Sequence, residues 1–284
     1  MLTGGAQPVA RRAAVLGKPI GHSLSPVIHN AGFAAAALPG WSYVAIECAE
    51  AELAGLVGGL GPEWAGLSLT MPLKQEALRL AAAASPVARV TGAANTLVRR
   101  DDGGWYADNT DVAGMVRVLR AAGVGGSGSP SVTVLGGGGT ARAALAAAAQ
   151  LGAVEVTVAT RRAEARAELV PAAEALGVKI AGAEWAAAAR FFDADAVIST
   201  VPKGAADHLA GQVTWRPGTV LFDAIYDPWP TPLAAVAVAA GVPVVSGLDL
   251  LLAQALSQFE QFTGVTPAPE PAMRAALFEA AGRR

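Results

Sequence analysis

Short apolar runs alternate with longer amphipathic runs along nearly the whole chain. Short apolar runs bounded by Gly or Pro are typical of buried strands, and apolar residues spaced three and four apart are typical of helices. The pattern of the first part predicts strands at 13–17, 41–46, 65–69, 95–99 and 105–107, and helices over 25–38, 50–60, 72–82 and 110–122.

The second part repeats this alternation, after a stretch rich in Gly, Ser and Pro at 123–130 that is typical of a loop. Repeated strand–helix–strand units favour a parallel sheet with helices on both faces, so we expect an α/β protein with a doubly wound sheet. The pattern predicts strands at 132–135, 154–159, 196–199, 219–222 and 242–245, and helices over 141–151, 164–176, 249–262 and 270–281.

Composition and charge narrow the class of protein. The chain has 284 residues, of which 53% are apolar and 15% charged, and a net charge of −2. This balance lacks the basic footprint of a protein that binds nucleic acid or an anionic membrane. No apolar stretch approaches the roughly 20 residues of a membrane span, and the start of the chain lacks the apolar core of a signal peptide. The single cysteine, Cys48, excludes an intrachain disulfide, and we expect a cytoplasmic protein.

Two serines flank the start of the first long predicted helix. Ser25 is expected as the N-cap and Pro26 as the first helical residue, because these types are preferred there. Hydroxyls at a helix N-terminus suit a carboxylate ligand. Capping alone could explain Ser25, but the sequence gives Ser23 no capping role. The pair is therefore a candidate carboxylate site.

A glycine turn follows the strand predicted at 132–135 and precedes a helix. Glycines let the backbone turn tightly and approach a pyrophosphate, whose charge is stabilised by N–H groups at the helix start. The G-x-G-x-x-G spacing is incomplete here, but the position between strand and helix favours a dinucleotide site over a plain turn. The residues expected to hold the pyrophosphate are Gly136, Gly137, Gly138, Gly139 and Thr140.

The next predicted strand ends in Thr160, Arg161 and Arg162, without a carboxylate. An acidic residue at this place binds the ribose hydroxyls of NAD, whereas Arg binds phosphate through charge-assisted hydrogen bonds. The alternative, an exposed basic helix start, is unfavourable against the helix dipole without an anion nearby. The sequence therefore predicts NADP(H) rather than NAD.

An ordered set of motifs then resembles the shikimate dehydrogenase family. The resemblance runs from about residue 15 to residue 264, and the ordered set is far more specific than any one motif. Besides the glycine turn, the motifs are Gly17-Lys-Pro-Ile-Gly-His-Ser-Leu-Ser-Pro-Val-Ile-His-Asn30, Ser68-Leu-Thr-Met-Pro-Leu-Lys74, Gly92-Ala-Ala-Asn-Thr96, Asp108-Asn-Thr-Asp111, Ser199-Thr-Val-Pro-Lys-Gly204, Asp223-Ala-Ile-Tyr-Asp-Pro228 and Gly247-Leu-Asp-Leu-Leu-Leu-Ala-Gln254.

The resemblance implies reversible reduction of 3-dehydroshikimate to shikimate with NADPH, in the chorismate pathway of aromatic amino-acid biosynthesis. It implies Lys74 and Asp111 as the catalytic pair. Hydride delivery to a ketone creates an alkoxide, and a Lys beside a carboxylate can donate the proton that neutralises it. Most Lys–Asp pairs in proteins are surface salt bridges. Lys74, however, begins a predicted helix, where the helix dipole disfavours a cation, and this argues against a purely structural salt bridge. The resemblance leaves both roles open for Lys74, proton transfer and substrate orientation.

The other site residues are also implied by the resemblance. Ser23 and Ser25 would hold the substrate carboxylate, and Tyr226 would border the substrate. The ring hydroxyls would be bound by Thr70, Asn95, Asp111 and Gln254. The cofactor would lie near Thr200, the Ala224 backbone and Gly247.

Three positions depart from the family pattern. Ser68 stands for the usual Asn as a supporting residue, Thr140 for Ala, and Leu250 for Met beside the nicotinamide. His22 and His29 are interpreted as structural, since three histidines without ligand spacing give no support for a metal site.

We expect a substrate-binding catalytic domain over 1–110, completed by helices within 248–284, and an NADP-binding Rossmann-type domain over 111–247. Oligomeric state, monomer or homodimer, is left open. The alternatives are a quinate/shikimate dehydrogenase using NAD(P), a non-catalytic NADP(H)-binding sensor, and a folate-type methylene dehydrogenase. The arginine pair argues against NAD, the joint presence of Lys74, Asp111, Asn95 and Gln254 argues against a sensor, and the substrate motifs give the folate type no support.

Overall fold

The structure is a computed structural model that describes residues 10–126 and 128–282. The chain divides into two compact units. The first comprises the described residues of Met1–Ala88, Ala93–Thr110 and Ala255–Arg284, and the second comprises those of Arg89–Gly92 and Asp111–Gln254. No helix in the described part of the chain is long and apolar enough to cross a membrane.

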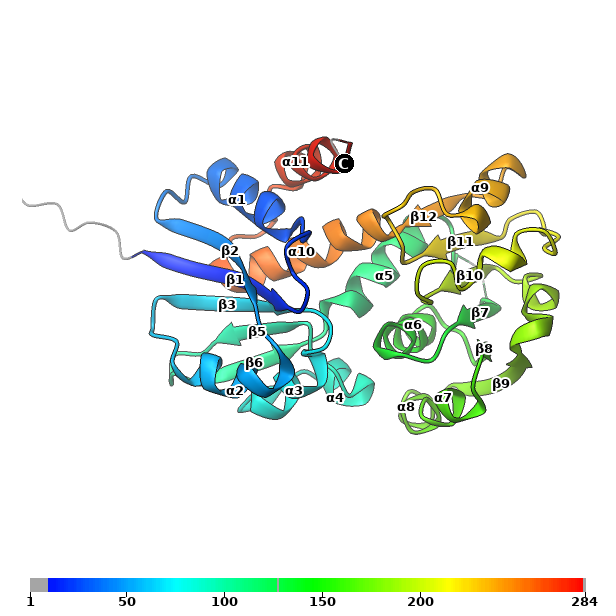
Figure 1. Ribbon diagram of the computed structural model, residues 1–284, viewed down its shortest axis with the longest axis horizontal. Coiled ribbons are helices and arrows are strands. Elements are labelled where there is room, and N and C mark those ends of the chain that lie inside the picture. Colours follow the sequence, from blue (N-terminus) through cyan, green and yellow to red (C-terminus); the bar gives the residue numbers. More distant parts are fainter. Residues whose placement is uncertain (1–9, 127, 283–284) are drawn as a thin grey trace, which may run out of the picture. The chain divides into compact units, whose positions relative to one another are not determined.

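The first unit contains a mixed sheet (Figure 1). Strand β1 pairs in parallel with β2 and β3, whereas β5 pairs antiparallel with β3 and β6. The strands, in the sheet order β2-β1-β3-β5-β6-β4, are β1 (Arg11–Gly17), β2 (Trp41–Glu47), β3 (Trp64–Leu69), β4 (Ala83–Ala84), β5 (Thr96–Arg99) and β6 (Trp105–Asp108).

Two layers of apolar side chains cover this sheet. On one face, Gly66 of β3 has no β-carbon, which leaves room for the ring of Phe262, and the Phe33 and Phe259 rings lie 5.6 Å apart. On the other face, Leu53 and Ala77 join a core cluster with strand residues. The helices of this part are α1 (Ser25–Ala35), α2 (Glu50–Gly58), α3 (Lys74–Leu80), α4 (Pro86–Thr91), α10 (Gly247–Thr263) and α11 (Glu270–Gly282), with α11 against α1.

The second unit contains an all-parallel sheet, which confirms the doubly wound prediction. Chain order reverses between β7 and β10, and ligands of such sheets bind beyond the carboxyl ends of the strands at this switch point. The strands, in the sheet order β12-β11-β10-β7-β8-β9, are β7 (Val132–Leu135), β8 (Glu155–Thr160), β9 (Lys179–Glu184), β10 (Ala196–Ser199), β11 (Val220–Asp223) and β12 (Val244–Ser246).

Small side chains let the helices of this unit approach the sheet closely. Helix α6 buries every residue from Ala143 to Ala148, because Ala adds little bulk between helix and strand. The helices, including two short 3₁₀ helices, are α5 (Thr110–Ala121), α6 (Gly139–Gln150), α7 (Ala163–Ala167), α8 (Val170–Ala175), η1 (Trp185–Phe191), η2 (Asp207–Leu209) and α9 (Pro232–Ala239).

One predicted helix was wrong. The segment 164–176 forms two short helices, because Pro171 lacks the N–H that would continue the helix from the preceding turn. Strand β9 was not predicted, since Ile180 is the only large apolar residue between its charged ends, Lys179 and Glu184, which gives little apolar signal.

Candidate active site

Several predicted substrate residues meet where β3 ends. Thr70 follows β3 directly, and the Leu69 N–H donates to the Asn95 carbonyl oxygen at 2.8 Å. The Ala94 N–H donates to the carbonyl oxygen of Lys74, also at 2.8 Å. These backbone bonds bring Thr70, Lys74 and Asn95 to one edge of the first sheet, which we call the substrate edge.

The serines beside α1 play different local roles from those expected. The helix begins at Ser25, and Leu24 is its N-cap, so the prediction of Ser25 as N-cap was wrong. The Ser23 hydroxyl oxygen instead accepts the Ser25 N–H, the first N–H of the helix, at 3.3 Å, a local role that the sequence did not predict for Ser23. Both hydroxyls still flank the helix start, and Ser25 is buried.

The Asn95 side chain is held in one orientation. Its Oδ1 accepts from the Thr96 hydroxyl at 2.8 Å, the Thr110 N–H at 2.8 Å and the Thr110 hydroxyl at 3.1 Å. Because these donors gather on the oxygen, the amide NH₂ is directed to the other side. Asp111 follows Thr110 in the first turn of α5, where the helix dipole stabilises a carboxylate.

A buried hydrogen-bond network lies behind this edge. The Tyr43 hydroxyl donates to Ser68 Oγ at 2.6 Å, and Ser68 donates to Gln258 Oε1 at 2.7 Å. Gln258 Nε2 donates to Thr96 Oγ1 at 3.0 Å and to the Asn95 carbonyl oxygen at 3.2 Å. We call these five residues the buried network. Ser68 was predicted as a supporting residue, whereas Gln258 was not predicted, although it follows Gln254 by one helical turn on α10.

The ring of His29 packs against Tyr43 of the buried network. The His29 and Tyr43 rings stack with centroids 4.2 Å apart and planes 3° from parallel. Burial lowers the pKa of His29 to about 3, with a smaller opposing effect from Gln258. Burial raises the pKa of Tyr43, and the hydroxyls of Ser68 and Ser25 offset part of that rise. In the described part of the chain, no cluster of three or more His, Cys, Asp or Glu could hold a metal ion.

The glycine turn after β7 has two parts with different roles. Gly136 has φ of +114°, and a β-carbon there would lie 2.5 Å from Thr200 Oγ1. A β-carbon on Gly137 would lie 2.9 Å from Ala165. Gly138 and Gly139 have no atom within 4 Å of the β-carbon position, so their side of the turn is open. Packing requires the first two glycines, and the last two leave room for a ligand.

Helix α6 begins at this open side. Its N-cap is Gly138, which has no side chain to accept the N–H groups of the first turn. The N–H groups at the start of a helix have no partner within the helix and carry partial positive charge. Thr140 adds a hydroxyl to the same turn. This combination suits a pyrophosphate.

The predicted 2′-phosphate residues lie at the neighbouring strand end. The Thr160 hydroxyl donates to the Arg162 carbonyl oxygen at 2.8 Å and so tightens the turn after β8. Arg161 and Arg162 are exposed, and neither forms an ion pair with a carboxylate of the described residues. Since β7 and β8 are adjacent and parallel, this turn lies at the same edge as the glycine turn.

Three more predicted cofactor and substrate residues lie together where β11 and β12 end. A β-carbon on Gly247 would collide with the Ala224 carbonyl oxygen and would lie 3.1 Å from the Tyr226 ring. The Thr200 hydroxyl donates to the Leu135 carbonyl oxygen at 2.7 Å, which ties the ends of β10 and β7 together. We call this rim of the second sheet, with the glycine turn, the nucleotide edge.

Asp223 supports the loop that carries Ala224 and Tyr226. Its carboxylate accepts the Thr231 hydroxyl at 2.7 Å and the Ile225 N–H at 3.2 Å. Burial raises the pKa of Asp223, and the Thr231 bond opposes that rise. The sequence motif contained Asp223, but its supporting role could not be read from the motif.

Gln254 lies in the buried part of α10. Its Nε2 donates to the Leu251 carbonyl oxygen at 3.0 Å, one turn earlier in the helix. A β-carbon on Gly114 of α5 would lie 3.1 Å from the Gln254 backbone nitrogen, so the two helices are in close contact there. The backbone of Gln254 is therefore fixed by packing.

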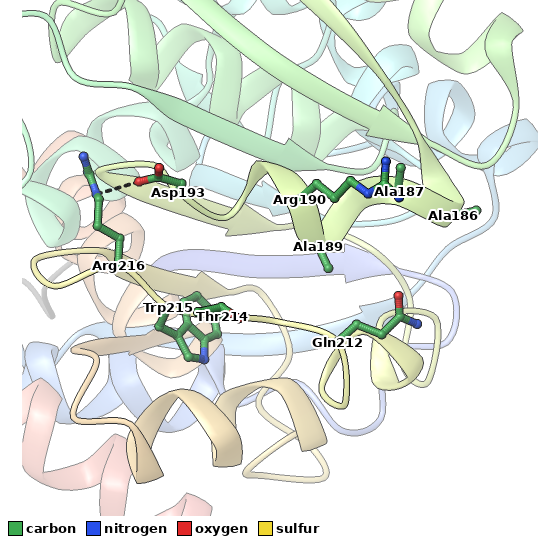
Figure 2. Close-up of a pocket in the computed structure, with 9 residues that line it drawn as sticks. All are labelled: Ala186, Ala187, Ala189, Arg190, Asp193, Gln212, Thr214, Trp215 and Arg216. Atoms are coloured by element: carbon green, nitrogen blue, oxygen red, sulfur yellow. Dashed lines mark ion pairs between the residues drawn. The ribbon is translucent and has the colours of Figure 1, made fainter.

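A hollow of about 610 Å³ in the second unit lies away from these residues (Figure 2). Arg216 in its wall is turned toward Asp193, with 3.2 Å between Nε and Oδ1, and a second carboxylate, Asp195, lies 2.6 Å from its Nη2. These carboxylates neutralise the guanidinium. The hollow contains none of the predicted cofactor residues, and its lining is Ala186, Ala187, Ala189, Arg190, Asp193, Gln212, Thr214, Trp215 and Arg216.

Family models match three parts of the chain. Residues 15–97 match the shikimate dehydrogenase substrate binding domain, and residues 247–278 match the shikimate 5'-dehydrogenase C-terminal domain. Residues 131–225, which include the nucleotide edge up to β11, match the model described as NADP oxidoreductase coenzyme F420-dependent.

Individual proteins are similar over nearly the full chain. A shikimate dehydrogenase (NADP(+)) from Caulobacter vibrioides is 40% identical over 263 residues, 90% of each chain. The crystal structure of Mycobacterium tuberculosis shikimate dehydrogenase is 46% identical, with a TM-score of 0.86 over 95% of this chain and 99% of that one. A quinate dehydrogenase from Corynebacterium glutamicum in complex with NAD is 26% identical, with a TM-score of 0.84 over 95% and 99%. The chain therefore belongs to the shikimate dehydrogenase family.

Proposed function

We propose that this protein is an NADP-dependent shikimate dehydrogenase, which reversibly reduces 3-dehydroshikimate to shikimate. The observation that carries the proposal is the substrate edge, where Thr70, Lys74 and Asn95 converge and the Asn95 amide is held in one orientation. The Caulobacter relative, 40% identical, has this activity in its name.

Lys74 is the proton donor in this proposal. Bound NADPH supplies the hydride. As negative charge develops on the ketone oxygen, the Lys74 ammonium donates a proton to it, and in the reverse direction the Lys74 amine accepts the hydroxyl proton. Asp111, in the first turn of α5, supplies the carboxylate of the pair.

The remaining substrate contacts follow the chemistry of a polyhydroxylated ring acid. Ser23 and Ser25 bind the carboxylate beside the start of α1. The ring hydroxyls bind Thr70, Asn95, Asp111 and Gln254, and Tyr226 borders the substrate. A site built to bond hydroxyls rejects analogues that lack them, because its own buried polar groups would be left unpaired.

NADP(H) fits the nucleotide edge. The uncapped start of α6 and the open side of Gly138 and Gly139 suit the pyrophosphate, with Gly136, Gly137 and Thr140 shaping the turn. Arg161 and Arg162, with Thr160, bind the 2′-phosphate. Ala224 and Gly247 would hold the nicotinamide of the bound cofactor, and Thr200 would line its approach.

The two units divide these tasks. Substrate binding belongs mainly to residues 1–110 with helices from 248–284, and cofactor binding belongs to residues 111–247. The border between the compact units at Thr110 supports the first limit of this division, whereas their second border lies after Gln254. We place the enzyme in the cytoplasm, in keeping with its buried free thiol, Cys48. It acts on a small-molecule substrate, as a monomer or a homodimer.

Quinate oxidation is the second candidate, because the fold also matches a quinate dehydrogenase bound to NAD. Quinate oxidation with NAD and shikimate oxidation with NADP differ in their need for a 2′-phosphate site. Quinate with NAD would have no use for a 2′-phosphate site, whereas Arg161 and Arg162 provide one. The arginine pair therefore favours shikimate with NADP.

One assay tests the proposal. The purified protein is incubated with shikimate or quinate, each with NADP or NAD, and reduced cofactor is followed by absorbance. We expect kcat/KM for shikimate with NADP to exceed each other combination by about tenfold or more, the gain from one charge-assisted contact. Faster turnover of quinate with NAD would establish the second candidate. No turnover in any combination would leave a non-catalytic NADP(H)-binding protein.

A further inference from the structure

The Asn95 carbonyl oxygen fixes the direction of every hydrogen bond in the buried network. A carbonyl can only accept, so the Gln258 atom that faces it at 3.2 Å is the Nε2 donor. Gln258 Oε1 therefore faces Ser68, which must donate its one hydroxyl proton across 2.7 Å. Since that proton is used, the Tyr43 hydroxyl must donate to Ser68 across 2.6 Å.

The other branch is fixed jointly by Gln258 and the backbone. Thr96 Oγ1 accepts from Gln258 Nε2 at 3.0 Å and donates to Asn95 Oδ1 at 2.8 Å. The Thr110 N–H donates to the same Oδ1 at 2.8 Å, so both donors hold the oxygen of the Asn95 amide inward and turn its NH₂ group the other way. Gln258 thus sets the direction of the Ser68 branch and supports the Asn95 branch through Thr96.

We propose that Gln258 is a positioning residue for substrate binding. It acts through Asn95 on one branch and through Tyr43, whose hydroxyl neighbours that of Ser25, on the other. The inference rests on the proposed function, because Asn95 and Ser25 are substrate ligands only there. Gln258 itself is fully buried, which leaves it no exposed surface to contact a substrate.

Only an amide of this length satisfies both neighbours. Gln258 presents an acceptor to Ser68 and a donor to the Asn95 carbonyl from a single planar group. A carboxylate at position 258 would turn lone pairs toward the Asn95 carbonyl oxygen. An apolar side chain at position 258 would leave the Ser68 hydroxyl without an acceptor. A buried polar group without a partner carries a cost, so the Ser68 and Thr96 hydroxyls would rotate to other acceptors.

The first test replaces Gln258 by the similarly long, apolar Met. Gln261→Met is the matched control, because Gln261 lies on the same helix and donates to Asp108 at 2.9 Å without joining the network. We expect Gln258→Met to raise KM for shikimate about tenfold, the equivalent of one net hydrogen bond, with kcat and KM for NADP changed less than about twofold. Gln261→Met should leave all three within about twofold of wild type.

A double-mutant cycle adds a readout that general destabilisation would not give. Ser68→Ala removes the group that Gln258 directs, so Ser68→Ala combined with Gln258→Met should raise KM for shikimate no more than the larger single effect. Effects that multiply would contradict a shared network. Each variant is also melted thermally, and KM values are compared only for the folded fraction.

The outcomes separate the two proposals. If the wild type fails to oxidise shikimate, the proposed function falls, and the positioning role falls with it. If the wild type is active and Gln258→Met matches Gln261→Met, only the positioning role is overturned. It is equally overturned if KM for NADP or kcat changes as much as KM for shikimate, because that pattern indicates a general structural defect.

Discussion

The substrate edge of the first unit is shaped by side chains that hold one another, whereas the nucleotide edge of the second unit is shaped by backbone and by missing side chains. Asn95 is held by bonds to Oδ1 from Thr96 and Thr110, and the buried network extends behind it. At the nucleotide edge, Gly138 and Gly139 offer only N–H groups and open space. Side chains select a substrate by its hydroxyls, and backbone accepts a phosphate common to many ligands.

This difference predicts two kinds of sensitivity to mutation. In the buried network, removing one polar group leaves its partner unpaired, so small chemical changes have large effects. At the glycine turn of the nucleotide edge, side-chain chemistry contributes little, but an added β-carbon matters wherever packing or the cofactor leaves no room.

Replacing Lys74 with Ala should slow the chemical step far more than it weakens cofactor binding. Loss of the proton donor should lower kcat with shikimate about a thousandfold, within the range typical of acid–base groups. NADPH affinity, measured by fluorescence titration, should stay near the wild-type value because the nucleotide edge is untouched. Lys179→Ala, at an exposed position on β9, is the control, and a similar kcat in both variants would remove Lys74 from the mechanism.

Protonation of His29 should destabilise the protein in acid. Its pKa is about 3 when folded and near 6.5 when unfolded, so the unfolded state binds a proton first as the pH falls. Stability should therefore be lost progressively from pH 6.5 down to about 3 and should reach a loss of about 2–3 kcal/mol at pH 4.5 from this group.

Urea unfolding at pH 7 and pH 4.5 measures this loss. His29→Phe keeps a stacked ring without a titrating group and should lose less stability in acid than wild type. His22→Gln, at an exposed position, should retain the wild-type loss. An equal pH dependence in all three proteins would show that His29 is protonated in the folded state or contributes nothing.

Two glycine substitutions should break the nucleotide edge in different ways. Gly136→Ala forces an L-residue to φ of +114° and a β-carbon against Thr200, so we expect a loss of about 2 kcal/mol in the free energy of unfolding. Gly139→Ala meets no protein atom and should leave the melting temperature unchanged, yet raise Kd for NADP about tenfold, as an obstructed phosphate contact would. Tight NADP binding by Gly139→Ala would mean that the pyrophosphate does not approach this side of the turn.

Removing the two arginines should change cofactor preference without changing the fold. In the Arg161→Ala, Arg162→Ala double variant, KM for NADP should rise about ten- to a hundredfold, the loss of charge-assisted bonds to one phosphate. KM for NAD should change by less than about threefold, since NAD has no 2′-phosphate to bind. Arg190→Ala, in the hollow of Figure 2, should affect neither. Equal losses for both cofactors would contradict 2′-phosphate recognition.

Local pattern was enough to predict the parallel sheet, the strand at Val132–Leu135 and the glycine turn, because these depend on apolar runs and backbone freedom. It failed where the local path of the chain or a distant residue decides. The Ser23 hydroxyl accepts the Ser25 N–H only because the chain turns before α1. Gln258, which accepts from Ser68, lies 190 residues from it. Pro171 indicated the break before Val170, but the helical pattern of the surrounding residues outweighed this single signal.

The buried network has a consequence for how the enzyme responds to acidity. His29 stays unprotonated down to about pH 3, and burial moves the ionisation of Tyr43 toward still more alkaline solution. These two side chains behind Asn95 therefore keep the same proton count between those limits. An inflection in the logarithm of kcat against pH within that range would come from groups other than His29 and Tyr43.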